Sequence, residues 1–140
     1  IYSSDLKRAW QTTQFILRTQ SHMQWTVSSD LREVSYHHFA PGRAPLSLSE
    51  RKNVREERLA LERFVALVRR THAPGEKILV VCHGNVIRSI VPLFANRRPE
   101  KAVMMDVNNT GIVILEVWSS GEAVIRLANC VRHLIPKQVT

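Results

Sequence analysis

Residues 77–88 read Lys-Ile-Leu-Val-Val-Cys-His-Gly-Asn-Val-Ile-Arg, and this stretch decides the class of fold. Its first half, residues 77–82, is a continuous apolar run of strand length, which is typical of a buried parallel strand. The three residues that follow form a tight turn, and residues 86–94 have the pattern of a helix that Pro92 distorts. A buried strand that leads directly into a helix predicts layers of helices packed on a sheet.

The rest of the chain alternates between helical and strand-like patterns. Ser3-Ser4-Asp5 has the chemistry of a helix N-cap, and Ser47 with Glu50 forms an S-x-x-E capping box. We expect a strand that ends at residue 2, helices over 6–18 and 49–70, a short strand over 25–27, a loop over 36–45, and a β-hairpin formed by 111–118 and 123–127. This order predicts an α/β domain with a mixed sheet.

Length and composition limit the possible functions. The chain has 140 residues, enough for one domain, and its 44% hydrophobic and 23% charged residues are typical of a globular protein. Its net charge of +8 favours an anionic partner, which leaves nucleic acid, an acidic membrane surface or a phosphorylated substrate. No apolar run is long enough to span a bilayer. Two cysteines do not make a disulfide framework, so a reducing compartment fits best.

Lys7 and Arg8 lie in the first turn of the helix expected over residues 6–18. The helix dipole places partial positive charge at this end, so acidic residues are favoured there. One interpretation is that both are solvated surface cations. The other is that an anion binds at this end, held by the guanidinium of Arg8 together with free backbone N–H groups.

His83 directly follows the buried strand and precedes a helix, which is where open α/β sheets bind ligands. Gly84 allows a close approach to the backbone. The alternative is a structural histidine whose hydrogen bonds are satisfied. Cys82 is the neighbour of His83 on the strand, and adjacent strand residues point to opposite faces. We therefore expect Cys82 to be a small buried hydrophobe rather than a nucleophile.

Other polar residues give weaker signals. Glu33, just beyond an expected strand, is either a general acid with a raised pKa or an ordinary loop carboxylate. His37 and His38 are adjacent, which is poor spacing for two ligands of one metal, so we expect a surface loop and no metal site. The helix over 49–70 mixes basic and acidic residues, which indicates a solvated face with ion pairs rather than a nucleic-acid surface. The G-x-x-x-x-G-K phosphate loop is absent.

Four short motifs occur in an order found in one superfamily. They are Tyr-Ser-Ser-Asp-Leu-Lys-Arg-Ala at 2–9 with Thr-Thr at 12–13, Leu-Arg-Glu at 31–33, Val-Val-Cys-His-Gly at 80–84, and Val-Asn-Asn-Thr-Gly-Ile at 107–112. Together they span nearly all of the chain and resemble the histidine phosphatase superfamily, which has the phosphoglycerate-mutase-like fold. The resemblance implies a single three-layer α/β domain over residues 1–140 with a mixed, mostly parallel sheet.

The resemblance also implies roles for residues of these motifs. It implies that Arg8 and Gly84 bind phosphate, that His83 is the second active-site histidine and contacts the transferring phosphoryl group, and that Glu33 donates a proton. The segment after Glu33 departs from the family's Gly-x-x-x-Gly pattern. The implied reaction proceeds through a phosphohistidine that water hydrolyses. It requires no metal and no other cofactor.

Residues 82–88 and the tail at 133–136 look most like those of a mitochondrial protein serine/threonine phosphatase of this superfamily. This implies phosphoprotein substrates, an intracellular location in mitochondria or cytoplasm, and no nucleic-acid partner. Four alternatives remain open: a phosphoglycerate mutase, a small-molecule phosphatase of the same fold, a phospho-binding scaffold without turnover, and nucleic-acid binding driven by the positive charge.

One motif of the superfamily has no counterpart in this chain. The family's first strand ends in Arg-His-Gly and carries the histidine that accepts the phosphoryl group, whereas Arg132-His133 is followed by Leu134 in the tail. Because that strand is central in the fold, we expect an N-terminally truncated domain with two unpaired strand edges and an apolar groove between them. We expect a longer protein, or completion by a separate segment or by a second protomer in a homo-oligomer.

Overall fold

The computed structural model describes residues 1–35, 45–97 and 105–139, and nearly all of the loop expected over 36–45, including His37 and His38, lies outside these ranges. The described elements are β1 (Tyr2–Ser4), α1 (Lys7–Thr19), β2 (Thr26–Ser28), the 3-10 turn η1 (Ser29–Leu31), α2 (Leu48–Thr71), β3 (Val80–Val81), α3 (Gly84–Phe94), β4 (Ile112–Val117), β5 (Ala123–Cys130) and the 3-10 turn η4 (Pro136–Gln138).

The strands form two separate sheets. The first has the order β2-β1-β3 and is parallel throughout, with Ser3 opposite both Val27 and Val81. The second is the antiparallel hairpin of β4 and β5, which confirms the expected late hairpin. Because the three parallel strands run together, their carboxyl ends meet at one edge, and the residues that follow each strand are brought together there.

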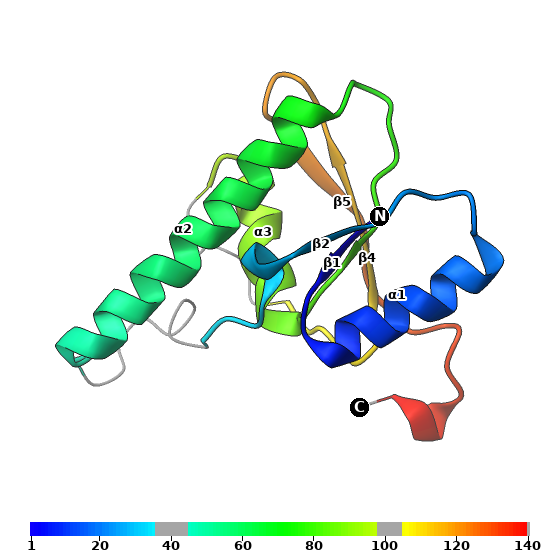
Figure 1. Ribbon diagram of the computed structural model, residues 1–140, viewed down its shortest axis with the longest axis horizontal. Coiled ribbons are helices and arrows are strands. Elements are labelled where there is room, and N and C mark those ends of the chain that lie inside the picture. Colours follow the sequence, from blue (N-terminus) through cyan, green and yellow to red (C-terminus); the bar gives the residue numbers. More distant parts are fainter. Residues whose placement is uncertain (36–44, 98–104, 140) are drawn as a thin grey trace.

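Helices cover the parallel sheet on both sides, which confirms the expected α/β architecture. Figure 1 shows α1 on one side of the strands and α2 with α3 on the other. Phe64 of α2 is 1% exposed and packs edge-on against Tyr2 of β1, with ring centroids 5.4 Å apart. The apolar core on this side comes from α2, α3 and the segment after η1: Leu31, Val34, Leu61, Phe64, Val65, Val68, Val86 and Ile90.

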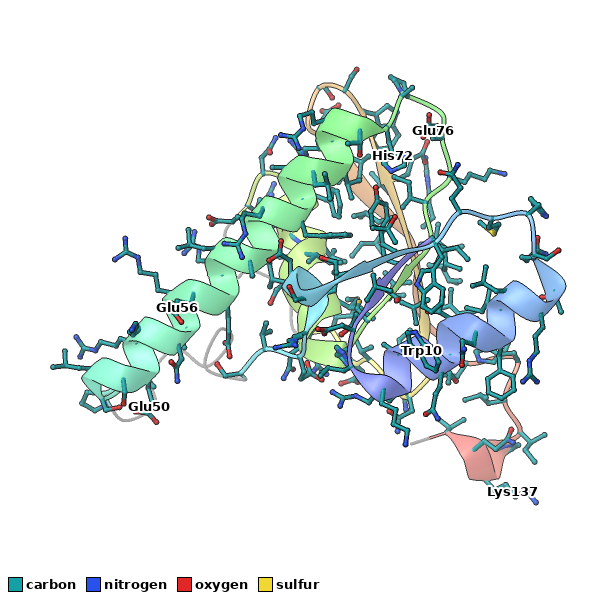
Figure 2. All side chains as sticks on the ribbon, in the orientation of Figure 1. Trp10, Glu50, Glu56, His72, Glu76 and Lys137 are labelled. Carbon is teal, nitrogen blue, oxygen red and sulfur yellow. The ribbon has the colours of Figure 1, made fainter. Side chains whose placement is uncertain are left out.

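The capping box at the start of α2 is present as expected. Ser47 Oγ accepts from the backbone N–H of Glu50 at 3.3 Å, and a carboxylate oxygen of Glu50 accepts from the backbone N–H of Ser47 at 2.8 Å. The N-terminal half of α2, which carries Glu50 and Glu56, extends away from the strands (Figure 2). The capping box therefore stabilises the end of α2 that has little packing to support it.

The charged face of α2 is laced with ion pairs, as expected for a solvated surface. Lys52 lies 3.8 Å from Glu56, and Arg58 lies 2.8 Å from Glu62, both one helical turn apart. Lys52 and Arg58 are therefore paired within the helix, and Arg63 pairs with Asp30 of η1.

The expected cap at Ser3-Ser4-Asp5 is wrong. β1 continues to Ser4, and the N-cap of α1 is Leu6, which makes no side-chain capping bond. Ser4 pairs with Ser28 of β2 and is fully buried. Its hydroxyl accepts from the N–H of Leu6 at 3.2 Å and also lies against His83. Ser4 is thus a strand residue because of its tertiary contacts, although its local chemistry favours a helix cap.

The strand expected over 77–82 is shorter and more exposed than its apolar sequence suggests. Only Val80–Val81 is assigned as strand, and Leu79 is 38% exposed. The reason is that, among the described residues, β3 pairs with β1 alone, so the flank toward β4 has no partner strand.

An apolar groove lies between the two sheets. It has a volume of about 690 Å³ and is lined by residues of both β3 and β4. Within the described ranges these two strands do not pair with each other. An apolar groove of this kind was expected, but that a further strand belongs in it stays a prediction. Aliphatic side chains dominate its wall, among them Ile78, Val81, Ile87, Val91, Ile112 and Leu115.

Candidate active site

Arg8 and His83 meet at the carboxyl edge of the parallel sheet. Arg8 Nε donates a hydrogen bond to His83 Nδ1 at 3.0 Å. His83 is the N-cap of α3 and is only 5% exposed, whereas the side chain of Arg8 is 62% exposed. The structure therefore brings the two strongest sequence candidates together, with the imidazole held inside and the guanidinium open to a ligand.

The environment of His83 favours the neutral imidazole. Burial, together with the positive charge of Arg8, lowers the pKa of His83 to about 4, although the nearby Asp5 opposes this shift. His83 is thus uncharged at neutral pH in the free protein. A neutral ring has one nitrogen lone pair that can accept a proton or a hydrogen bond.

Glu33 completes the cluster from the segment that follows η1. One of its carboxylate oxygens accepts from the backbone N–H of Asn85 at 3.2 Å, in the first turn of α3. The other lies 3.6 Å from Arg8 Nη2 and 4.0 Å from His83 Nδ1. In the free protein, the carboxylate of Glu33 is therefore the anion that lies beside Arg8.

Gly84 is the first residue of α3, directly after His83. A Cβ built on it would lie 3.8 Å from the nearest atoms of Val107, an ordinary van der Waals distance. The chain itself therefore does not require glycine here. A close approach of a ligand to this backbone stays a prediction.

Two residues that the sequence reasoning missed connect the segments of the site. Asp5 accepts from Arg32, with Arg32 Nη2 at 2.7 Å from Asp5 Oδ2. Asn85 donates through its side chain to the carbonyl of Val34 at 3.1 Å and accepts from Arg88 Nη1 at 2.9 Å. Asp5 adjoins Ser4, and Asn85 adjoins Gly84, but nothing in a single sequence indicates which distant partner each would contact.

Cys82 packs as a hydrophobic side chain rather than serving as a nucleophile, as expected. Burial raises the pKa of the Cys82 thiol to about 12, and the side chain packs against the apolar core. The thiolate needed by a nucleophile is therefore disfavoured. Within residues 1–35, 45–97 and 105–139, no three His, Cys, Asp or Glu side chains are grouped so as to hold a metal ion. Over the same ranges, no helix is both long and apolar enough to cross a membrane.

The chemistry of this cluster suits a phosphoryl group. A guanidinium and the free N–H groups at the start of a helix bind phosphate oxygens, and the dipole of the helix adds favourable potential. A carboxyl group and an imidazole beside them can hold and transfer protons. Arg8, the unusual basic residue in the first turn of α1, thus lies beside the start of another helix, α3.

Comparison with known proteins agrees with this chemistry. The sequence model of the histidine phosphatase superfamily (branch 1) matches residues 1–130. The chain belongs to the histidine phosphatase superfamily. It is also 26% identical to "Phosphoglycerate mutase-like protein 4" of Arabidopsis thaliana over an alignment of 155 positions, gaps included, which covers 96% of this chain and 65% of that protein. The chain therefore spans 65% of the length of this relative.

Membership of the histidine phosphatase superfamily points to phosphatase or mutase chemistry. The match includes both β1 with the start of α1, which carry Arg8, and the turn from β3 into α3, which carries His83. The superfamily match therefore covers the whole cluster, and the geometry alone places the cluster at the carboxyl edge of the parallel sheet.

Proposed function

We propose that this histidine phosphatase domain hydrolyses phosphomonoesters, with phosphoserine and phosphothreonine proteins as its substrates. The observation that carries the proposal is the convergence of Arg8, His83 and Glu33 on the first turn of α3. In this proposal Arg8 and the N–H groups of α3, with Gly84 at their start, bind the phosphoryl oxygens. His83 contacts the transferring group, and Glu33 donates the proton to the leaving oxygen.

The histidine that accepts the phosphoryl group is, in this proposal, on a strand outside this chain that occupies the groove between β3 and β4. The unpaired flanks and aliphatic wall of the groove suit an extended apolar segment. The groove is also lined by Arg8, Glu33 and His83, so a residue at the end of such a strand reaches the cluster. A separate segment or a second protomer of a homo-oligomer supplies the strand.

The proposed reaction has two steps. The neutral imidazole of the accepting histidine attacks phosphorus, a P–N bond forms and the ester P–O bond breaks. Glu33, which enters this step in its protonated form, gives its proton to the departing alkoxide and becomes a carboxylate. Water then attacks the phosphohistidine, Glu33 takes a proton from that water, and the P–N bond breaks to release inorganic phosphate. Positive charge from Arg8 stabilises the equatorial oxygens in both steps.

Protein substrates are favoured by motif resemblance. The sequences at 82–88 and 133–136 look most like phosphoglycerate mutase family member five, a mitochondrial protein serine/threonine phosphatase. This likeness supports a phosphoprotein substrate and a mitochondrial or cytoplasmic location for the present protein.

A second candidate is a phosphoglycerate mutase or a small-molecule phosphatase. The observation that favours it is the printed name of the Arabidopsis relative, which describes a phosphoglycerate mutase-like protein. The same cluster binds either kind of phosphate ester, because the contacts expected from Arg8 and α3 reach only the phosphoryl group.

The test combines the chain with an apolar strand that ends in Arg-His-Gly, fused ahead of Ile1, and measures phosphate release from phosphopeptides and from phosphoglycerates. We expect phosphopeptide turnover, an acid-labile phosphohistidine on the added strand, and a loss of about a hundredfold or more in His83→Ala. His22→Gln, on an exposed residue, is the matched control. Phosphoglycerate turnover alone supports the second candidate. Phosphopeptide binding without turnover makes the domain a scaffold and overturns the proposal.

A further inference from the structure

A buried hydroxyl contacts the inner edge of the His83 ring. Ser4 lies at the carboxyl end of β1 and has no exposed surface, and its Oγ is 3.0 Å from His83 Nε2. The other ring nitrogen, Nδ1, is 3.0 Å from Arg8 Nε. His83 is therefore held at both nitrogens, by a fixed strand residue on one side and by an exposed cation on the other.

The contact with Arg8 determines the direction of both hydrogen bonds. A guanidinium has only donors, so Nδ1 must present its lone pair to Arg8. The proton of the neutral ring is then on Nε2, and Nε2–H donates to Ser4 Oγ. Ser4 Oγ also accepts from the backbone N–H of Leu6 at 3.2 Å. Two donors thus occupy both lone pairs of this oxygen and fix its position.

We propose that Ser4 is a positioning residue that holds the His83 ring with Nε2–H turned inward and the Nδ1 lone pair facing Arg8 and the phosphoryl site. This role deepens the proposed function and rests on it in one respect. The expected effect on phosphate binding depends on the proposed function, whereas the orientation of the His83 ring does not. When a phosphate oxygen engages Arg8, the donor to Nδ1 is shared with the ligand. The contact with Ser4 is then the hydrogen bond that still fixes the ring.

Ser3 provides a matched control within the same strand. It is as fully buried as Ser4 and is its direct neighbour in β1. Adjacent strand residues point to opposite faces, and Ser3 Oγ accepts from Trp25 Nε1 at 2.8 Å instead of contacting His83. Ser3→Ala therefore removes a buried hydroxyl and its hydrogen bond without touching the ring of His83.

The ring itself is tested by ¹⁵N NMR of the imidazoles in the full chain at neutral pH. We expect a pyrrole-type Nε2 with a slowly exchanging proton, and a pyridine-type Nδ1, for His83. Ser4→Ala should lose the slow exchange, Ser3→Ala should keep it, and Ser4→Thr, which retains a hydroxyl, should restore it. A protonated Nδ1 in the wild-type ring overturns the proposal even if no variant folds, as does a Ser4→Ala spectrum identical to wild type.

The consequence for ligand binding is tested by calorimetry with inorganic phosphate. We expect Ser4→Ala to bind about fivefold to tenfold more weakly than wild type, as the loss of one hydrogen bond to a site residue predicts. Ser3→Ala should bind as wild type, and Ser4→Thr should recover most of the loss. Equal weakening in Ser3→Ala and Ser4→Ala assigns the effect to general packing and overturns the positioning role. If wild type binds no phosphate, the proposed function fails, while the NMR result still decides the role of Ser4.

Discussion

Asp5 and Arg32 form a two-pronged ion pair that ties together the two segments carrying the charged side chains of the site. Arg32 Nε lies 2.9 Å from Asp5 Oδ1, and Arg32 Nη2 lies 2.7 Å from Asp5 Oδ2. Asp5 precedes α1, which begins with Lys7 and Arg8, and Arg32 is adjacent to Glu33. A fork of two parallel hydrogen bonds fixes orientation as well as distance. The pair therefore helps to set Glu33 relative to Arg8, because Asp5 and Arg32 themselves lie outside the helices and strands.

Breaking this ion pair should weaken phosphate binding modestly. Because the pair is largely exposed to solvent, we expect Asp5→Asn and Arg32→Gln each to lower the affinity for inorganic phosphate by about twofold to fivefold. The double variant should be no weaker than either single variant, since one lost contact accounts for both. Calorimetric titration of the wild type, the two single variants and the double variant with inorganic phosphate completes the double-mutant cycle. Fully additive losses would show that the two side chains act independently.

Removing the charge of Glu33 should separate binding from turnover. The carboxylate lies between Arg8 and the N–H of Asn85, where a phosphate dianion would experience its repulsion. We expect Glu33→Gln to bind inorganic phosphate a few-fold more tightly, because it keeps an acceptor for Asn85 but loses the charge. Turnover by the completed protein should fall about a hundredfold or more, because the proton donor is lost.

The control for Glu33 is Glu56→Gln, which changes the same charge in the half of α2 that extends away from the strands (Figure 2). It should leave both phosphate affinity and turnover unchanged. A parallel loss of binding and turnover in Glu33→Gln would contradict a proton-donor role and leave only a structural one.

The buried His83 should make the fold sensitive to mild acid. Burial and Arg8 lower its pKa from 6.5 to about 4, so the unfolded chain takes up this proton more readily than the folded protein. Its contribution to stability is fully present above about pH 6.5 and is lost as the pH falls toward 4. The free energy of unfolding in urea should decrease by about 2 kcal/mol between pH 7 and pH 5 through this residue.

His83→Gln should abolish that part of the pH dependence, and His22→Gln, at an exposed position, should retain it. Asp5 and Glu76 have lowered pKa values, through hydrogen bonds to Arg32 and His72 respectively. Their contributions are lost only at lower pH, as the carboxylates take up protons below their ordinary values of 3.8 and 4.5. An unchanged slope between pH 7 and pH 5 in His83→Gln would contradict the prediction.

Phe64 should be among the most sensitive positions of the core. It is 1% exposed and supports Tyr2, the first residue of the strand that ends in Ser4. Phe64→Ala should lower the free energy of unfolding by about 3–5 kcal/mol, because it leaves a cavity and removes an aromatic contact. Leu48→Ala, at a side chain 86% exposed, should change it little. Urea denaturation of both variants provides the comparison, and equal losses would contradict the assignment of this core.

Patterns that depend on neighbours in sequence were predicted well. The long helix α2 and its capping box at Ser47 and Glu50 appear as expected, as does the hairpin of β4 and β5. Each depends on contacts within a few residues, or across one turn, so the local sequence contains the information. The histidine phosphatase motifs likewise indicated the edge of the sheet where Arg8 and His83 meet.

Where the same residue has two local options, sequence alone did not choose correctly. The local chemistry of Ser4 favours a helix cap, but its pairing with β2 and its contact with His83 make it a strand residue. The apolar run at 77–82 is typical of a buried strand, but its exposure depends on whether a neighbour pairs with its second edge.

The sequence by itself determined the order of helices and strands, the superfamily motifs and the identity of the candidate site residues. The folded chain was needed to show that Glu33 provides the anion beside Arg8, that Ser4 contacts the inner edge of His83, and that β3 and β4 are the strands that line the groove. The difference lies in how far apart along the chain the interacting residues are. Helix periodicity and capping act over a few residues, whereas side-chain hydrogen bonds and strand pairing join segments that only the folded chain brings together.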